Sequence, residues 1–317
     1  MLNQALAIAN GKGGVGKTSL TANLAAIAAH SGWEVLAIDL DPQGNLGADL
    51  GYHQRGLSDD GGALSRAIQF GDLLEPPVRR IRPNLDAIPA GVLTGELARV
   101  LHERGPFEAA DSFDKALAPL AGSYDLILFD CPPGDDVLGS LGLAMARSLV
   151  IPIKFDAGSL DGLELMAARV HEIKTSGVNA ALQLLGIALF DLNPRATALR
   201  RQITEELELD FAHGVRVFEA GIRHSQRAAY DMRQDGYTAI EYELIAARDK
   251  RERLAMLRRG PEVLELAGPA KSQSAAGLAD DYTRLTNEIL QAFSAPLPVG
   301  DESVTVDLTE ADMATIW

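Results

Sequence analysis

The sequence predicts an α/β fold in which helices cover both faces of a mainly parallel, twisted sheet. Apolar runs typical of buried strands alternate with helical stretches throughout residues 1–190, a pattern that favours parallel strands. A glycine-rich loop follows the first apolar run, and acidic residues end two later runs. The 317 residues are enough for one large domain of this class.

The first element is a strand, Ala5–Ala9, and the loop Gly11–Thr18 after it fits the phosphate-loop pattern G-x-x-x-x-G-K-[ST]. A helix is expected over Ser19–His30. Glycines let backbone N–H groups point at phosphate oxygens, and the helix N-terminus adds positive charge there. The pattern predicts that Lys17 binds β- and γ-phosphates and that the Thr18 hydroxyl ligates Mg²⁺. The residues expected to surround the nucleotide are Gly13, Gly14, Val15, Gly16, Lys17, Thr18 and Ser19.

Acidic residues follow two further predicted strands. Asp39 and Asp41 come after the strand Glu34–Ile38, and Asp130 follows Tyr124–Phe129. Because the carboxyl ends of parallel strands border the ligand crevice, these carboxylates are expected beside the phosphates. Asp130 is expected to hold Mg²⁺ through a water molecule. The alternative for the first two is that they cap an Asp-Pro turn.

A second lysine, Lys12, lies inside the loop, and with it the loop resembles the deviant Walker A motif of the ParA/MinD family of ATPases. The segments Asp39–Asn45 and Asp130–Pro133 also resemble that family. In the family the extra lysine crosses a dimer interface and contacts the ATP of the partner. The resemblance implies this role for Lys12, positioning of the attacking water for Asp41, and a place in the outer shell of the magnesium ion for Asp39.

Apolar patterns and the resemblance place the other elements of the first 190 residues. In chain order we expect a short helix within Leu57–Phe70, a strand at Leu85–Pro89, helices at Leu93–His102, Asp111–Ala121 and Gly139–Arg147, a strand at Ser148–Ile153, a helix at Glu164–Ser176 and a strand at Leu182–Phe190. Cys131 is interpreted as a small packing residue, because no histidine motif accompanies it.

Four segments divide the chain. Residues 1–243 are expected to form the ATPase domain, 244–277 an added basic helix and a linker, 278–293 a C-terminal helix that packs on the domain, and 294–317 an acidic, flexible tail. The added helix is expected over Leu244–Arg259. It either extends a DNA-binding face or is a solvated surface helix.

Bulk composition excludes several classes of protein. No apolar run approaches the roughly 18 residues of a membrane span. Cys131 is the only cysteine, which excludes an intrachain disulfide and a thiolate cluster held by one chain. No signal-type segment precedes the first strand, so a cytoplasmic protein is expected. The net charge of −15 opposes non-specific DNA binding, which must therefore depend on a local basic patch.

The resemblance implies surface arginines that bind DNA without reading its sequence, and Arg195, Arg223 and Arg227 align with this region. The alternative is a solvated, ion-paired face, because acidic residues are interspersed. The family's base-binding turn falls near Gly221–Ser225, where Arg223 replaces the usual proline, so adenine contacts stay open.

The function implied is an ATP-dependent dimerising switch for plasmid or chromosome partition. ATP and Mg²⁺ would close a homodimer that binds non-specific DNA on the nucleoid, and a ParB-type partner would stimulate hydrolysis. No helix-turn-helix precedes the loop, as in short ParA proteins. The main alternative is a MinD-like ATPase that positions at membranes or cell poles, although the acidic tail would be repelled by anionic lipid, so no membrane partner is expected. A nucleotide-binding scaffold also stays open, whereas an electron donor like the nitrogenase iron protein would need a second cysteine.

Overall fold

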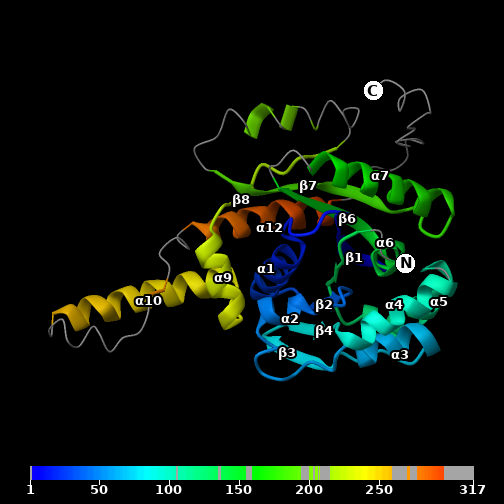
Figure 1. The fold of residues 1–317 in the computed structure, drawn as a ribbon, viewed down its shortest axis with the longest axis horizontal. Coiled ribbons are helices and arrows are strands. Elements are labelled where there is room, and N and C mark those ends of the chain that lie inside the picture. Colours follow the sequence, from blue (N-terminus) through cyan, green and yellow to red (C-terminus); the bar gives the residue numbers. More distant parts are fainter. Residues whose placement is uncertain are drawn as a thin grey trace.

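The computed structural model describes residues 2–104, 106–134, 137–154, 159–193, 200–202, 204–205, 207, 215–258, 270–271 and 277–295. Among them one sheet has the strand order β3-β4-β2-β5-β1-β6-β7-β8 (Figure 1). The strands are β1 (Leu2–Ile8), β2 (Val35–Asp39), β3 (Val78–Arg82), β4 (Leu85–Ile88), β5 (Leu126–Asp130), β6 (Ala146–Lys154), β7 (Gln183–Leu192) and β8 (Ile222–Arg223). Of the described pairings, only β3 with β4 is antiparallel. The predicted fold class is confirmed.

Helices cover both faces of this sheet, and each face has its own hydrophobic core. The helices are α1 (Lys17–His30), α2 (Asn45–Leu50), α3 (Gly62–Phe70), α4 (Val92–Arg104), α5 (Pro106–Ala121), α6 (Val137–Met145), α7 (Ser159–Thr175), α9 (Gln226–Asp235), α10 (Ala239–Leu257) and α12 (Leu278–Ser294). One core joins α1, α2, α9, α12 and the base of α10. The other joins α3, α4, α5, α6 and α7.

The central strand β1 shows why its sequence is almost continuously apolar. Ala5 and Ala7 contribute to one core, whereas Leu6 and Ile8 contribute to the other. Side chains alternate across a strand, so a strand buried on both faces needs apolar residues at successive positions.

The edge strand β3 was not predicted. Its residues Val78–Arg82 include three arginines, and its pairing with β4 is irregular in register. Arg80 has a φ of 50°, and its N–H donates to Asp86 at 2.6 Å. A short, charged, irregular strand lacks the alternating apolar pattern on which strand prediction depends. The other expected elements are present, with α5 and α7 beginning at least one turn before the predicted residues.

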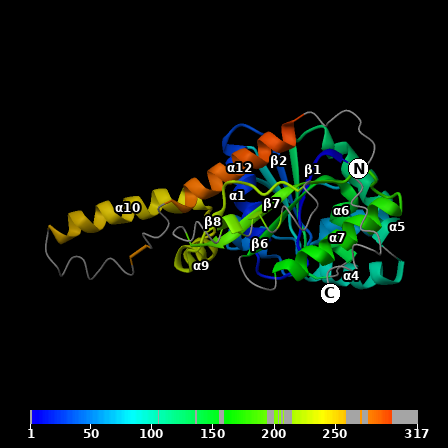
Figure 2. The same cartoon turned by 90° about the horizontal axis from the view of Figure 1, so that it is seen from above.

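Helix α10 begins before the expected Leu244, so it runs across the proposed division between residues 243 and 244. Glu241 defines its start, because its carboxylate accepts the Thr238 N–H at 2.8 Å in a capping-box arrangement. From this base α10 projects away from the body of the molecule (Figures 1 and 2). No helix in the described part of the chain is both long and apolar enough to cross a membrane.

Replacing Glu241 with glutamine is expected to destabilise the protein at neutral pH, with a loss that shrinks in acid. Burial alone would raise the pKa of Glu241, but the hydrogen bonds from Arg82, at 2.6 and 2.7 Å, together with the charge of Arg82 and the hydrogen bonds from Thr238, lower that pKa below its usual value. A lowered pKa means that the stabilisation is present above the unfolded pKa and is lost as the pH falls through the folded one. We expect a cost of about 1–3 kcal/mol at pH 7.

Thermal unfolding between pH 3 and 8 measures this difference. The matched control is Glu252→Gln, which breaks an exposed pair with Arg248 on the same helix and should change stability little. A constant cost of Glu241→Gln at every pH would contradict the ion-pair explanation.

Candidate nucleotide-binding site

The glycine-rich loop lies at the carboxyl edge of the sheet, between β1 and α1. Gly16 immediately precedes α1 and has a φ of 97°. A Cβ at this position would lie 2.5 Å from Cδ1 of Phe190 in β7. Any side chain at residue 16 would therefore both strain the backbone and clash with an aromatic ring. The turn of the loop is fixed by β7 as well as by the loop's own sequence.

The two lysines of the loop are in contact through the backbone. The Lys17 amino group, which is buried, donates to the Lys12 carbonyl oxygen at 3.0 Å. Burial lowers the pKa of this amino group below its usual value, opposed by the negative charge of Asp130. The Lys12 N–H donates to Asn10 Oδ1 at 2.8 Å, and Asn10 in turn donates to the carbonyl of Pro152 in β6. The loop is thus held to the neighbouring strand, with the Lys17 charge directed into its centre.

Asp130 ends β5, where it is paired in register with Ile8 of β1 and Asp39 of β2. Its carboxylate is completely buried, and Thr21 Oγ1 lies 3.2 Å from Oδ1. Burial raises the pKa of Asp130 to about 7, although a hydrogen bond from the Thr18 hydroxyl acts against this rise. Its other oxygen, Oδ2, has no hydrogen-bond partner among the described residues.

These donors fit a magnesium ion bound together with a nucleotide. A buried carboxylate oxygen without a partner, beside a threonine hydroxyl, provides oxygen donors of the kind that Mg²⁺ prefers. Within the described residues no three acidic, histidine or cysteine side chains gather into a metal site of their own. A cation here therefore needs phosphate and water oxygens to complete its coordination. Of the predicted metal residues, Thr18 and Asp130 come together in this way.

Asp39 and Asp41 organise the turn after β2. The Asp39 carboxylate is completely buried and accepts the N–H groups of Asp41 at 2.9 Å and Leu46 at 3.2 Å. Burial, and then the charge of Asp130, raises the pKa of Asp39 well above its usual value. The carboxylate of Asp41 accepts the Gln43 N–H through Oδ1 at 3.0 Å. Both carboxylates thus cap the turn after β2, which is the alternative that the sequence offered for Asp39 and Asp41.

Comparison with known proteins decides the family. The sequence profile of a family described as "AAA domain" matches residues 3–184. The chromosome partitioning protein ParA of Myxococcus xanthus is 33% identical over 259 residues, which cover 76% of this chain and 87% of that protein. The chromosome-partitioning ATPase Soj of Treponema pallidum is 34% identical over 215 residues, covering 68% and 81%. The chain belongs to the ParA/Soj family of ATPases.

A solved structure supports the fold of this ParA/Soj-family chain. Cobyrinic acid a,c-diamide synthase from Mycobacterium smegmatis, with a bound ATP analog and magnesium, superposes with a TM-score of 0.61 at 25% identity. The match covers 77% of this chain and 96% of that protein. The fold of this ParA/Soj-family chain is therefore that of a P-loop ATPase.

The three predicted DNA-binding arginines have different environments in this ParA/Soj-family chain. Arg195 lies outside the described residues. Arg223 forms a two-pronged ion pair with Asp281 of α12, with Nε and Nη2 at 2.6 and 2.7 Å from the two carboxylate oxygens. Its geometry joins β8 to α12, a structural role that differs from the expected DNA contact. Arg227 is 62% exposed and pairs with Asp231 at 2.9 Å. Both pairings match the ion-paired alternative.

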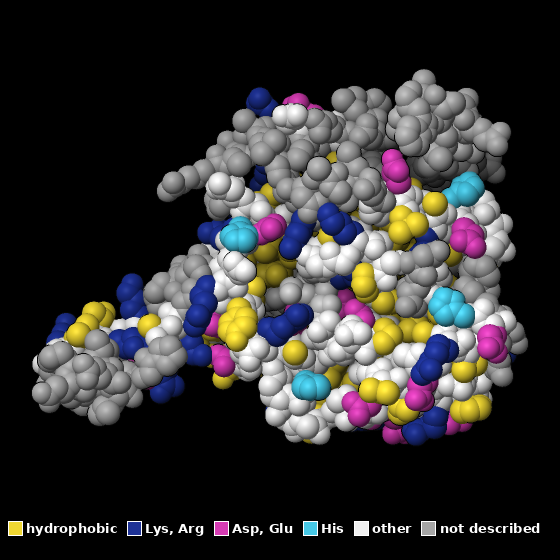
Figure 3. Space-filling view, in the orientation of Figure 1, with side chains coloured by type: hydrophobic (Ala, Val, Ile, Leu, Met, Phe, Trp, Pro, Cys, Tyr) yellow, Lys and Arg dark blue, Asp and Glu magenta, His cyan; other side chains and the backbone are white. Residues whose placement is uncertain are grey.

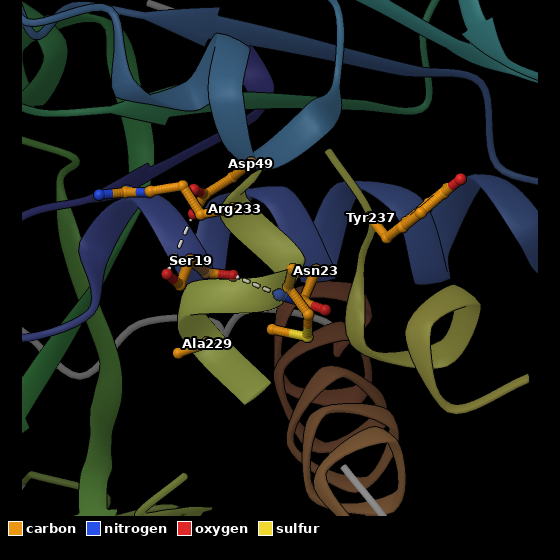
Figure 4. Close-up of a pocket in the computed structure, with 7 residues that line it drawn as sticks. Ser19, Asn23, Asp49, Ala229, Arg233 and Tyr237 are labelled. Atoms are coloured by element: carbon orange, nitrogen blue, oxygen red, sulfur yellow. Dashed lines mark hydrogen bonds and ion pairs between the residues drawn. The ribbon is translucent and has the colours of Figure 1, made fainter. Parts of the chain in front are cut away.

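One cluster beside the loop was not foreseen from the sequence. Ser19, expected only as a nucleotide contact, donates its hydroxyl to Asp49 of α2 at 3.0 Å. Asp49 also accepts Arg233 of α9 at 2.6 Å (Figure 4). Nothing local signals this contact, because Asp49 and Arg233 are 184 residues apart in the chain. The cluster borders a small pocket lined by Ser19, Asn23, Asp49, Ala229, Met232, Arg233 and Tyr237.

Proposed function

We propose that this partition ATPase is a dimerising switch that binds non-specific DNA in its ATP state and hydrolyses ATP on stimulation by a ParB-type partner. The observation that carries this proposal is the loop itself. It places Lys17 beside Asp130 at the carboxyl edge of the sheet and adds Lys12 on the same turn. Relatives of this chain are named chromosome partitioning proteins, which supports DNA as the molecule that this chain helps to partition.

The residues of the loop have distinct tasks towards ATP. Lys17 exchanges its single carbonyl acceptor, on Lys12, for oxygens of the β- and γ-phosphates. Backbone N–H groups of the glycine turn and the N-terminus of α1 bind the remaining phosphate charge. Magnesium, held by Thr18 and through water by Asp130, supplies charge neutralisation when it is bound. The carboxylate of Asp41 positions the attacking water, and Asp39 supports it by fixing the turn.

Lys12 is the residue through which two copies of the chain would share each nucleotide site. Its backbone is fixed on both sides, by Asn10 at the N–H and by Lys17 at the carbonyl. We assign its side chain to the phosphates bound by a second copy of the chain. Two copies closed face to face across this edge would each complete the other's site. Association of the copies then depends on the triphosphate, since the lysines otherwise repel one another.

The basic surface needed for DNA lies on α9 and α10. Figure 3 shows lysine and arginine side chains gathered over the α10 arm and the adjoining α9. Lys250 and Arg258 are exposed, and the side chain of Arg227 is mostly exposed. DNA binding by such a patch is compatible with the net charge of −15, because phosphate contacts depend on local cations. Binding of this kind concentrates the protein on the nucleoid.

Replacing Arg227 with glutamate is expected to weaken ATP-dependent DNA binding by about tenfold, because a cation near the phosphates becomes an anion. Gel shifts of non-specific DNA with ATP, with ADP and without nucleotide measure this. The matched control is Lys115→Glu, which reverses the same charge in another i,i+4 pair, on α5. An equal loss in the control would point to bulk charge. Binding of the parent that ignores the nucleotide would contradict the switch.

One observation favours the MinD-like alternative. Leu244, Leu254 and Leu257 are exposed on the basic helix α10, and exposed leucines beside cations are typical of helices that lie on membrane surfaces. Sedimentation with anionic liposomes, with and without ATP, separates the two functions. Partition predicts that the protein stays in the supernatant, whereas a membrane-positioning ATPase would sediment only with ATP.

A further inference from the structure

Two hydrogen-bonded routes lead from the start of α1 to the helices that carry the basic surface. In the first, Ser19 donates to Asp49 Oδ2 at 3.0 Å, and Arg233 of α9 donates to Asp49 Oδ1 at 2.6 Å (Figure 4). In the second, Asn23 donates to the Ser19 carbonyl and accepts the N–H of Ala239, the first residue of α10, both at 2.8 Å. Both routes pass through Ser19, which directly follows the phosphate loop.

The first route has the properties of a strong contact. Asp49 is 8% exposed, so its charge depends on Ser19 and Arg233 more than on water. Hydrogen bonds to a buried ionised carboxylate are worth more than bonds between neutral groups, and loss of one donor is correspondingly costly. The position of α9 relative to α1 is therefore sensitive to how Asp49 is shared between its two donors.

The two helices also set the position of Arg227. Arg227 pairs with Asp231 at 2.9 Å, and Asp231 accepts the hydroxyl of Tyr242 in α10 at 2.6 Å. Tyr242 is completely buried. A displacement of α9 or of the base of α10 relative to α1 thus reaches Arg227 through bonded contacts.

We propose that Arg233 is a positioning residue that, with Asp49, couples the phosphate loop to the Arg227 surface. Ser19 has one hydroxyl proton, and Asp49 holds it here. A nucleotide phosphate oxygen that accepts this proton leaves Asp49 to Arg233 alone, so that the Asp49 carboxylate ties α2 to α9 and no longer to α1, while the apolar packing of α2 on α1 is kept. The nucleotide then favours one of two arrangements of α9, as any ligand that drives a conformational change must. This inference rests on the proposed ATP-dependent binding of DNA.

The test is Arg233→Gln in the full-length chain, with DNA affinity measured with and without ATP. We expect the ATP-dependent gain in DNA affinity to fall by about fivefold or more, and the DNA-dependent gain in ATP affinity to fall by the same factor, because coupling is reciprocal. Arg233→Lys, which keeps a cation beside Asp49, should restore part of the gain.

The control is Arg82→Gln. Arg82 donates to Glu241 of α10, to the Gly236 carbonyl after α9 and to the Leu50 carbonyl of α2, so it joins the same helices through partners other than Ser19 and Asp49. If Arg82→Gln lowers the gain as much as Arg233→Gln, or if Arg233→Gln leaves the gain as in the parent, the coupling role is wrong although the switch stands. If the parent itself shows no gain with ATP, the proposed function and this inference both fall.

Discussion

Replacing Lys17 with alanine is expected to abolish ATP binding. Its amino group is buried at the centre of the loop, and this burial lowers its pKa. A bound phosphate therefore contacts a cation that is shielded from water, and water cannot take the place of that cation once it is removed. Charge-assisted hydrogen bonds of this kind are worth about 1.5–3 kcal/mol each. With more than one such bond lost, affinity should fall by at least about a hundredfold.

Calorimetric titration with ATP and magnesium measures this loss. Lys115→Ala removes an exposed lysine of α5 and should leave the affinity unchanged. Circular dichroism checks that the Lys17→Ala chain is folded, which we expect because removal of a buried charge relieves a desolvation cost. A folded variant whose affinity lies within a few-fold of the parent would refute the assignment of Lys17 to the phosphates.

Replacing Asp41 with alanine is expected to preserve ATP binding and dimer formation while turnover is lost. The Asp41 carboxylate lies at the carboxyl edge, buried by the turn, and its charge acts on Lys17 of the phosphate loop more weakly than that of Asp130. A residue that positions and polarises the attacking water contributes about 10²–10⁴-fold to the rate. Phosphate release with excess ATP should therefore fall by at least about a hundredfold.

The same variant tests the dimer, because slow turnover preserves the triphosphate. Light scattering with ATP and magnesium should report twice the mass of the nucleotide-free protein. Asp41→Asn is the matched variant, since an amide oxygen still accepts the Gln43 N–H and keeps the turn. Hydrolysis at the parent rate would show that the water assignment is wrong, and a monomer under all conditions would remove the dimerising switch.

The parts predicted well from the sequence are those that short motifs determine. The loop needs glycines at fixed positions, and the buried strands β1 and β5 need continuous apolar runs, so both are visible in the chain itself. The meeting of Asp39 and Asp130 followed from a topological rule, that parallel strands end at one edge. Residues 194–199, which include Arg195, and residues 296–317, which are most of the predicted tail 294–317, lie outside the described part.

The parts that were missed depend on contacts between distant segments. Arg223 was grouped with the DNA-binding arginines, yet Asp281, 58 residues later, pairs with it. Arg233 contacts Asp49 across an even longer separation. Strand β3 was missed because an edge strand exposed to water carries charges where a buried strand carries valines. Patterns in one sequence report local propensity and burial. They do not identify which distant residue forms an ion pair with a given side chain.

The two ends of the sheet limit how copies of this chain can associate. At one end, β3 is charged and irregular, and at the other, β8 consists of only Ile222 and Arg223. Neither offers the long row of backbone donors and acceptors that another molecule needs to extend a sheet. Open-ended polymers that grow by strand addition are therefore disfavoured. The closed pair proposed for the ATP state needs no such edge, and its growth would stop at two copies.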